Sequence, residues 1–97
     1  MDAIAACAAL IRQLANSDAN KSEIMAAGGG ETLVGLLAAH QHAGGWEVVE
    51  HVLGTLCALT LRSPETSEAL LELGGVDAVM DVLQRAFDIS KLGTRKV

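Results

Sequence analysis

The feature that most constrains the fold of this chain is an internal repeat with a period of 46 residues. Residues 24–40 (IMAAGGGETLVGLLAAH) align without a gap with residues 70–86 (LLELGGVDAVMDVLQRA). In each copy an apolar segment is followed by a glycine pair, Gly28-Gly29 or Gly74-Gly75, and then by a second apolar segment. Self-similarity at a fixed period of 20–50 residues is typical of stacked repeat proteins.

The composition favours helices as the repeating elements. Apolar residues make up 51% of the chain, yet aromatic residues make up only 2%, and there is one proline and no tyrosine. Leu, Val, Ile, Ala and Met must therefore build the core, and this set suits close helix-on-helix packing better than a sheet. We expect an all-α fold.

The spacing of apolar residues predicts a series of helices separated by short turns. The first four expected elements are a helix over 3–15, a short helix over 21–27 capped by Asn20, a second helix over 31–39, and a third over 46–61. Residues 40–45 (HQHAGG) are expected to form a flexible loop between the second and third helices. In the next copy we expect a turn over 62–66, a short helix over 66–73, a second helix over 76–86, and a new third helix from 92. For that short helix, Ser63-Pro64 and Thr66 are alternative starts.

These elements indicate one fragment of a repeat array spanning residues 1–97. Its parts are the third helix of a truncated repeat (3–15), a complete repeat (20–62), the first and second helices of the next repeat (66–87), and a tail (88–97). About two repeats is below the usual minimum of three, so we expect marginal stability or self-association of the isolated piece. Neighbouring repeats of a longer parent chain are the expected covering surfaces.

The pattern resembles the armadillo repeat. The resemblance is carried by residues 10–37 (LIRQLANSDANKSEIMAAGGGETLVGLL) and 59–83 (LTLRSPETSEALLELGGVDAVMDVL). The short first helix of that family, ending in a small residue and glycine, looks like IMAAGG and LLELGG, and its second helix looks like LVGLL and VMDVL. The resemblance implies an armadillo-type α-solenoid, a right-handed superhelix of three-helix repeats whose third helices line a concave groove.

The resemblance also bears on which ligand such a groove could bind. Armadillo proteins that bind extended peptides carry a recurrent Asn and Trp along the groove. Here the Asn positions hold Gln13 and Leu59, and the Trp positions hold Ala9 and Thr55. The departure argues against binding of nuclear-localisation peptides of the importin-α kind and leaves other groove chemistry open.

The expected function is a non-enzymatic protein–protein interaction scaffold that binds a protein or peptide on the concave face. Gln13 and Asn16 are candidate hydrogen-bonding groups, and Arg12 and Arg62 are candidates for an acidic partner. The remaining candidate protein-binding residues are His51 and Thr55. The alternative is that the repeats form the substrate-targeting arm of a larger enzyme, such as a ubiquitin ligase.

Other chemistry finds little support in the sequence. Gly28-Gly29-Gly30 lacks the preceding strand and the Lys-Ser/Thr of a phosphate loop. His40, His42, His51 and Cys57 lack the spacing of a zinc site, and Cys7 and Cys57 are expected to be buried, reduced thiols. No arrangement typical of a nucleophile or of paired catalytic carboxylates is found. We expect no catalytic residues, no metal site and no cofactor.

The charge distribution disfavours nucleic acid as a partner. The net charge of the chain is −5. Three of the basic residues, Lys91, Arg95 and Lys96, lie in the last seven positions, so the net charge of the rest of the chain is more negative still. An acidic surface repels phosphate backbones. The basic end is interpreted as solvated, with a lipid contact as a weaker alternative. Because no apolar run approaches the length of a membrane span, we expect no membrane association and a cytoplasmic or nuclear location.

Overall fold

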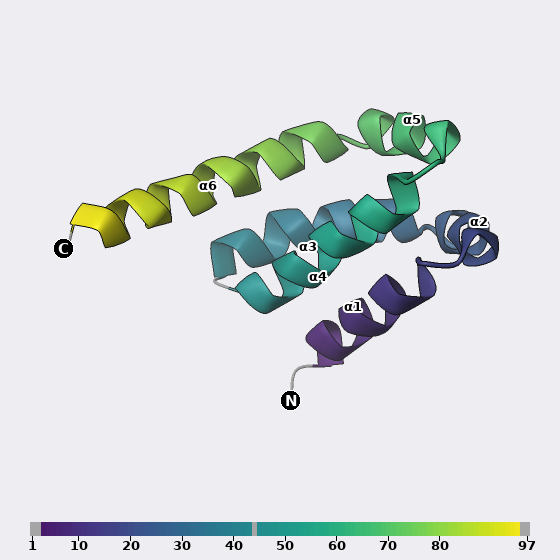
Figure 1. The fold of residues 1–97 in the computed structure, drawn as a ribbon, viewed down its shortest axis with the longest axis horizontal. Coiled ribbons are helices and arrows are strands. Elements are labelled where there is room, and N and C mark those ends of the chain that lie inside the picture. The colour runs from purple at the N-terminus through teal and green to yellow at the C-terminus, as the bar shows by residue number, and fades with distance from the viewer. Residues whose placement is uncertain (1–2, 44, 96–97) are drawn as a thin grey trace.

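The computed structural model describes residues 3–43 and 45–95, except for the side chains of 40–43 and 92–95. This part of the chain is helical and contains no strand, which confirms the all-α prediction. The helices are α1 (Ala3–Leu14), α2 (Asp18–Ala26), α3 (Gly29–Ala43), α4 (Trp46–Thr60), α5 (Pro64–Glu72) and α6 (Gly75–Arg95). Figure 1 shows α4 next to α3, with α1 on one side and α5 and α6 on the other.

The helix boundaries repeat with the same 46-residue period as the sequence. Helices α2 and α5 begin at Asp18 and Pro64, and each is nine residues long. Helices α3 and α6 begin 46 positions apart as well, at Gly29 and Gly75. The ends of α1 and α4 obey the same rule. The chain therefore contains one complete three-helix unit, α2-α3-α4, preceded by the counterpart of α4 and followed by the counterparts of α2 and α3.

Each glycine pair performs two different tasks at the junction between a short helix and the next. Gly28 and Gly74 both have φ of +82°, the left-handed conformation that ends a helix and that residues with a Cβ resist. Gly29 lies so close to the preceding turn that a Cβ would be 2.5 Å from the carbonyl oxygen of Ile24. At Gly75 the corresponding distance to a backbone carbonyl oxygen is 2.7 Å. The sequence prediction of a left-handed end at Gly28 is confirmed.

The first short helix starts earlier than predicted, and the second starts at Ser63-Pro64, one of its two predicted alternatives. The N-cap of α2 is Ser17 and that of α5 is Ser63, with Pro64 in the first turn, so the prediction of Asn20 as a cap is wrong. Pro64 suits this place because its fixed φ is helical and its missing N–H has no helical partner in the first turn. Asn20 instead donates its side-chain amide to the carbonyl of Leu14 at 3.0 Å, which fastens α2 to the end of α1.

Both second helices run further than predicted. Helix α3 continues to Ala43 and includes most of the segment 40–45 that was expected to be a loop. Helix α6 is 21 residues long and passes without a break through residue 92, where a new helix was expected, so the prediction of a tail over 88–97 is wrong up to Arg95. The segment 84–91 contains neither glycine nor proline, and side-chain pairs one turn apart support it. Gln84 donates to Asp88 at 3.1 Å, and the Lys91 ammonium lies 4.5 Å from the centre of the Phe87 ring.

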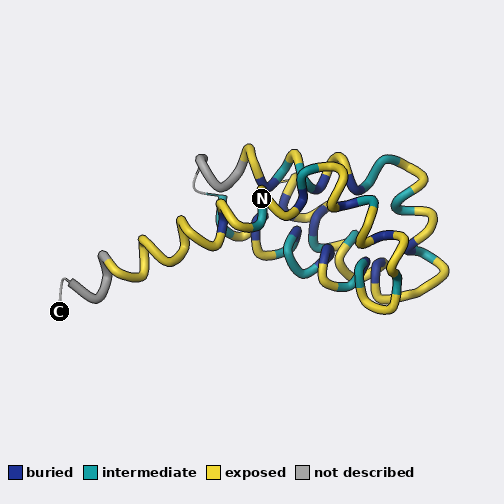
Figure 2. Tube along the Cα trace, turned by 90° about the horizontal axis from the view of Figure 1, so that it is seen from above, coloured by how far each residue is buried: buried dark blue, intermediate teal, exposed yellow. Residues whose placement is uncertain are grey.

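The core is centred on α4. Val48, Val49, Val52 and Leu59 are at most 2% exposed, because α4 packs between α1 and α3. Helix α1 approaches α4 closely through small side chains, of which Ala5 is typical. Figure 2 shows the buried residues gathered in this body and residues 83–91 of α6 exposed.

Candidate protein-binding site

The sequence-predicted binding residues lie on α1, on α4 and in the turns that follow them, and these two helices pack side by side. Arg12 is exposed, and its guanidinium lies directly on the backbone of α4 at Gly54. A Cβ at Gly54 would overlap Nε and Cζ of Arg12. The glycine thus leaves room for the arginine to lie across the neighbouring helix, which places a cation on the shared α1–α4 surface.

Two further candidates are accessible at the end of α1. Gln13 lies in the last turn of the helix and Asn16 in the turn that follows, and both are exposed. The backbone N–H of Asn16 donates to the carbonyl of Gln13 at 3.3 Å, so the two residues belong to one tight turn. Both side-chain amides are therefore accessible within one short stretch of the surface.

The candidates in the middle of α4 are less accessible. Thr55 is fully buried and its hydroxyl donates to the carbonyl of His51 at 2.8 Å, so it does not present its side chain to the surface as we expected. Its burial follows from the close packing of α4 against its neighbours. His51 is half-buried, and within the described residues its Nδ1 atom is buried without a hydrogen-bond partner.

Arg62 lies in the turn between α4 and α5 in an unusual backbone conformation. Its φ is +56°, a left-handed value that residues other than glycine, asparagine and aspartate seldom adopt. The side chain is exposed, and its Nη2 atom lies 3.8 Å from the Asp18 carboxylate at the start of α2. The turn therefore brings this predicted cation to the junction of α2 and α5 rather than into the middle of α4.

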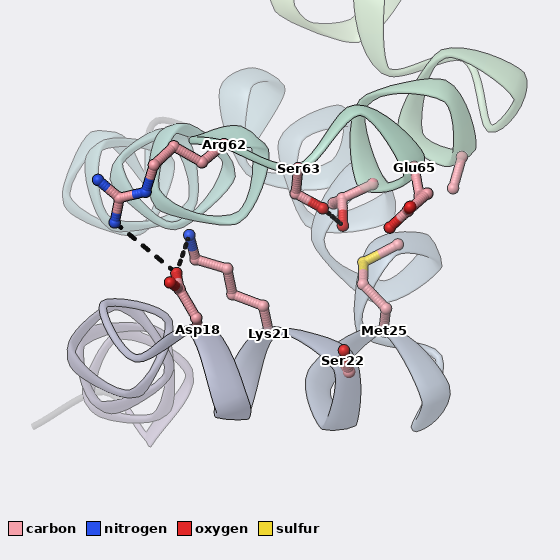
Figure 3. A pocket seen from close by; sticks show the side chains of 9 residues that line it. Asp18, Lys21, Ser22, Met25, Arg62, Ser63 and Glu65 are labelled. Atoms are coloured by element: carbon pink, nitrogen blue, oxygen red, sulfur yellow. Dashed lines mark hydrogen bonds and ion pairs between the residues drawn. The ribbon is translucent and has the colours of Figure 1, made fainter.

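An ion-pair cluster that the sequence analysis missed fixes this junction. Lys21 is only 6% exposed. Its ammonium donates to the Asp18 carboxylate at 2.9 Å and to the carbonyl of Leu61 at 2.9 Å. Figure 3 shows Lys21 and Arg62 both directed toward Asp18. The hydrogen bond from Lys21 and the two nearby positive charges lower the pKa of Asp18 below its usual range.

The cluster forms one wall of a surface pocket of about 430 Å³ between α2 and α5. The lining residues are Asp18, Lys21, Ser22, Met25, Arg62, Ser63, Glu65, Thr66 and Ala69. Within it, Ser63 donates its hydroxyl to Thr66 at 2.8 Å. The pocket holds charges of both signs together with hydroxyls, which suits a polar peptide segment better than an apolar ligand.

Asp18 and Lys21 carry a signal that could have been found in the sequence. Opposite charges three positions apart on a helix face one another. Because we placed the start of the short helix at Lys21, Asp18 fell in the preceding turn and the pair was not considered. A start at Ser17, the counterpart of Ser63 one period earlier, would have indicated it.

The cysteines and histidines do not form a metal site in the described part of the chain. Cys7 and Cys57 are free and exposed, so the prediction that both are buried is wrong. Among the described residues, no group of three or more His, Cys, Asp or Glu side chains is placed to hold a metal ion. The side chains of His40 and His42 lie outside the described residues.

None of the described helices combines the length and the apolar character needed to cross a bilayer. In comparisons with protein-family models, with curated proteins and with solved structures, nothing matched the chain. The functional interpretation therefore rests on the residues and their geometry.

Proposed function

We propose that the chain is an armadillo-type segment that acts as a protein–protein interaction scaffold, with the α1–α4 surface as its peptide-binding face. In this proposal α1 and α4 are third helices of successive repeats, and a bound segment crosses both of them. The support for this assignment is the 46-residue period that the helix boundaries share with the sequence.

The observation that carries the binding proposal is the position of Arg12. Its guanidinium lies across Gly54 on the adjacent helix and remains exposed, so one cation serves the surface of two helices. A guanidinium presents parallel N–H donors that match a carboxylate in a bidentate manner. Gln13 and Asn16 lie just beyond it and can hydrogen-bond the backbone of an extended peptide.

The partner that this chemistry favours is an acidic, extended peptide segment. The chain itself is acidic, so an acidic peptide is repelled at long range and must be held by local contacts to Arg12. Selectivity would then come from placing carboxylates opposite the arginine, and peptides with scattered acidic residues would bind weakly.

Binding can be measured by fluorescence anisotropy against a library of labelled Asp/Glu-containing peptides. We expect Arg12→Glu to weaken the peptides selected by the wild type by about tenfold or more, because a charge-assisted contact worth roughly 1.4 kcal/mol is replaced by repulsion. The matched control is Arg85→Glu, which makes the same charge change at an exposed position of α6. Equal losses for the two variants would refute the α1–α4 face, as would a library in which no peptide binds.

A further inference from the structure

The two copies of the repeat are covered to very different degrees on the same helix face. Leu37 of α3 is fully buried, whereas its counterpart Leu83 of α6 is 59% exposed. Val34 is half-buried, and its counterpart Met80 is 54% exposed. Helices α4, α5 and α6 all contact α3, whereas the equivalent positions of α6 stay exposed in the described part of the chain.

The next pair of positions shows the same contrast. Gly30 is buried because the side chains of Leu70 in α5 and of Leu73, the C-cap of α5, lie on it, with methyl carbons 3.3 and 3.1 Å from the position of a Cβ. Its counterpart Val76 is 53% exposed. The bare face of α6 therefore repeats, position by position, a face that already binds helices within this chain.

The opposite face gives the reverse contrast. Val82 of α6 is 4% exposed because α6 packs on α3, whereas its counterpart Leu36 on α3 is only half-buried. Leu36 lies at the edge of an apolar groove of about 620 Å³ between α1, α2 and α3, which is also lined by Cys7, Ile11 and Ile24. Residues of this groove are the counterparts, 46 positions earlier, of residues in α6 and its neighbours at the contact with α3. The groove is therefore the place where a helix equivalent to α3, from a preceding unit, would pack.

A second apolar groove lies at the other end of the molecule. It measures about 460 Å³, runs between α4, α5 and α6, and is lined by Leu53, Cys57, Val79 and Met80 among others. Within the complete unit, α4 packs against both α1 and α3. The equivalent helix for the next unit would pack against α4 and α6, and this groove is the space between them.

From these relations we infer that a second copy of this chain stacks head to tail on the first. The geometric step that relates α3 to α6 also relates α1 to α4. When this step is repeated once more, α1 of the second copy lies in the α4–α5–α6 groove of the first. The same step places α6 of the first copy in the α1–α2–α3 groove of the second. One docking event thus fills both grooves, because α4 follows α1 and α6 follows α3 at the same 46-residue period.

A second copy is favoured over an unrelated helix because the required contacts already exist inside the chain. The α3–α6 and α1–α4 interfaces are the templates, and the side chains at the bare positions are apolar like those at the covered ones. Such an interface joins two different surfaces, so each added copy leaves one free groove at each end. The assembly is then open-ended and its size grows with concentration.

Charge opposes this contact and gives it a characteristic salt dependence. Within the chain, Ala69 and Glu31 line the same hollow. Glu23 is the counterpart of Ala69, and Asp77 is the counterpart of Glu31. At the contact between two copies, Glu23 of the second copy would therefore lie near Asp77 of the first. Because like charges at an exposed interface are screened by salt, we expect added salt to strengthen the assembly.

The test uses two variants that each damage one groove partner. Leu36→Glu spoils the α1–α2–α3 groove, and Leu83→Glu spoils the bare face of α6. Sedimentation velocity should show wild-type protein growing in mass with concentration, while each variant alone is monomeric. An equimolar mixture of the two variants should form a dimer that grows no further, because it contains one intact pair of surfaces and no second pair.

Matched controls keep the result specific. Ala38→Glu and Gln84→Glu add the same charge at counterpart positions that are both exposed, so they should assemble like the wild type. Because Leu36 is half-buried, the exposed Cys7→Glu serves as a second variant of the same groove, and circular dichroism checks that each variant is helical. In the wild type, Cys7 and Cys57 should both become protected from alkylation on assembly; in the mixed dimer, each of them should be protected in one copy only.

The inference is overturned if the wild type stays monomeric at all accessible concentrations and salt levels. It is also overturned if Leu36→Glu alone still dimerises, because that would indicate a symmetric contact of α6 with α6. The inference rests on the repeat register and is measured without any peptide. Its failure would therefore leave the proposed α1–α4 binding face untouched, and failure of peptide binding would leave the assembly untouched.

Discussion

Lys21 is the residue whose surroundings depart most from what its type suggests. Lysine is seldom buried unless it is paired, and here the ammonium has a carboxylate from its own helix and a backbone carbonyl from the end of α4. The carbonyl belongs to Leu61, which precedes the left-handed Arg62. Lys21 therefore holds the backbone next to Arg62 against α2. Arg62 is the one non-glycine residue with a positive φ in the described chain.

We predict that Lys21→Met destabilises the protein by about 0.5–1.5 kcal/mol, because the part-buried hydrogen bond to the Leu61 carbonyl is lost while the apolar stem is retained. Urea unfolding followed by circular dichroism measures the change. The control Arg85→Met removes an exposed charge and should change the free energy of unfolding by no more than about 0.5 kcal/mol. Equal effects of the two substitutions would contradict the role assigned to the hydrogen bond.

The pH dependence separates the two contacts of Lys21. Because the pKa of Asp18 is lowered on folding, its ion pair stabilises the protein above the ordinary carboxyl pKa, and this contribution is lost as the pH falls through the lowered value. The hydrogen bond to the Leu61 carbonyl has no such dependence. The penalty of Lys21→Met should therefore be smaller at about pH 2 than at neutral pH, since the ordinary carboxyl pKa is about 3.9. A penalty that grows on acidification would contradict this assignment.

Among the elements, the helix junctions show what sequence reasoning could and could not reach. The glycine pairs were predictable because a repeated Gly-Gly after an apolar run has one common use, the left-handed end of a helix. The starts at Ser17 and Ser63 were harder, since Asn20 and Thr66 are equally good caps by residue type. Only the whole register, with nine-residue helices in both copies, selects the serines.

The length of α3 lay outside the reach of local patterns. Residues 40–45 contain polar and glycine residues that favour a loop, yet α3 continues to Ala43. Helix α6 continues past the point where the repeat would turn, and its residues 83–91 are exposed. Of the candidate binding residues, Arg12, Gln13, Asn16 and Arg62 are exposed, whereas Thr55 is fully buried because its burial depends on how closely the neighbouring helices pack on α4.

The glycines of α3 predict opposite stability effects within one helix. Gly35 is exposed and has open space around a Cβ, so Gly35→Ala should stabilise the protein by about 0.5–1 kcal/mol through reduced backbone entropy. Gly29→Ala should destabilise it by roughly 1–3 kcal/mol, because its Cβ would meet the Ile24 carbonyl and the backbone must shift. Chemical denaturation of both variants measures the two signs. A shared sign would contradict the packing described at this junction.

For the molecule as a whole, the central result is a three-helix unit that recurs with one fixed period. The molecule measures 47 × 31 × 19 Å, with the covered unit in its body and a bare apolar face on α6 at one end. The proposed binding face and the inferred head-to-tail stacking both follow from this arrangement. If the helix boundaries lacked this period, neither would retain its basis.

NMR backbone chemical shifts test the period most directly, because secondary Cα shifts report helix boundaries residue by residue. We predict breaks of the same kind at Gly28 and Gly74, each with a positive φ, and uninterrupted helical shifts from Gly75 through residue 91. A break at Gly28 without its counterpart at Gly74 would contradict the repeat. A second break within 84–91 would contradict the single long helix α6.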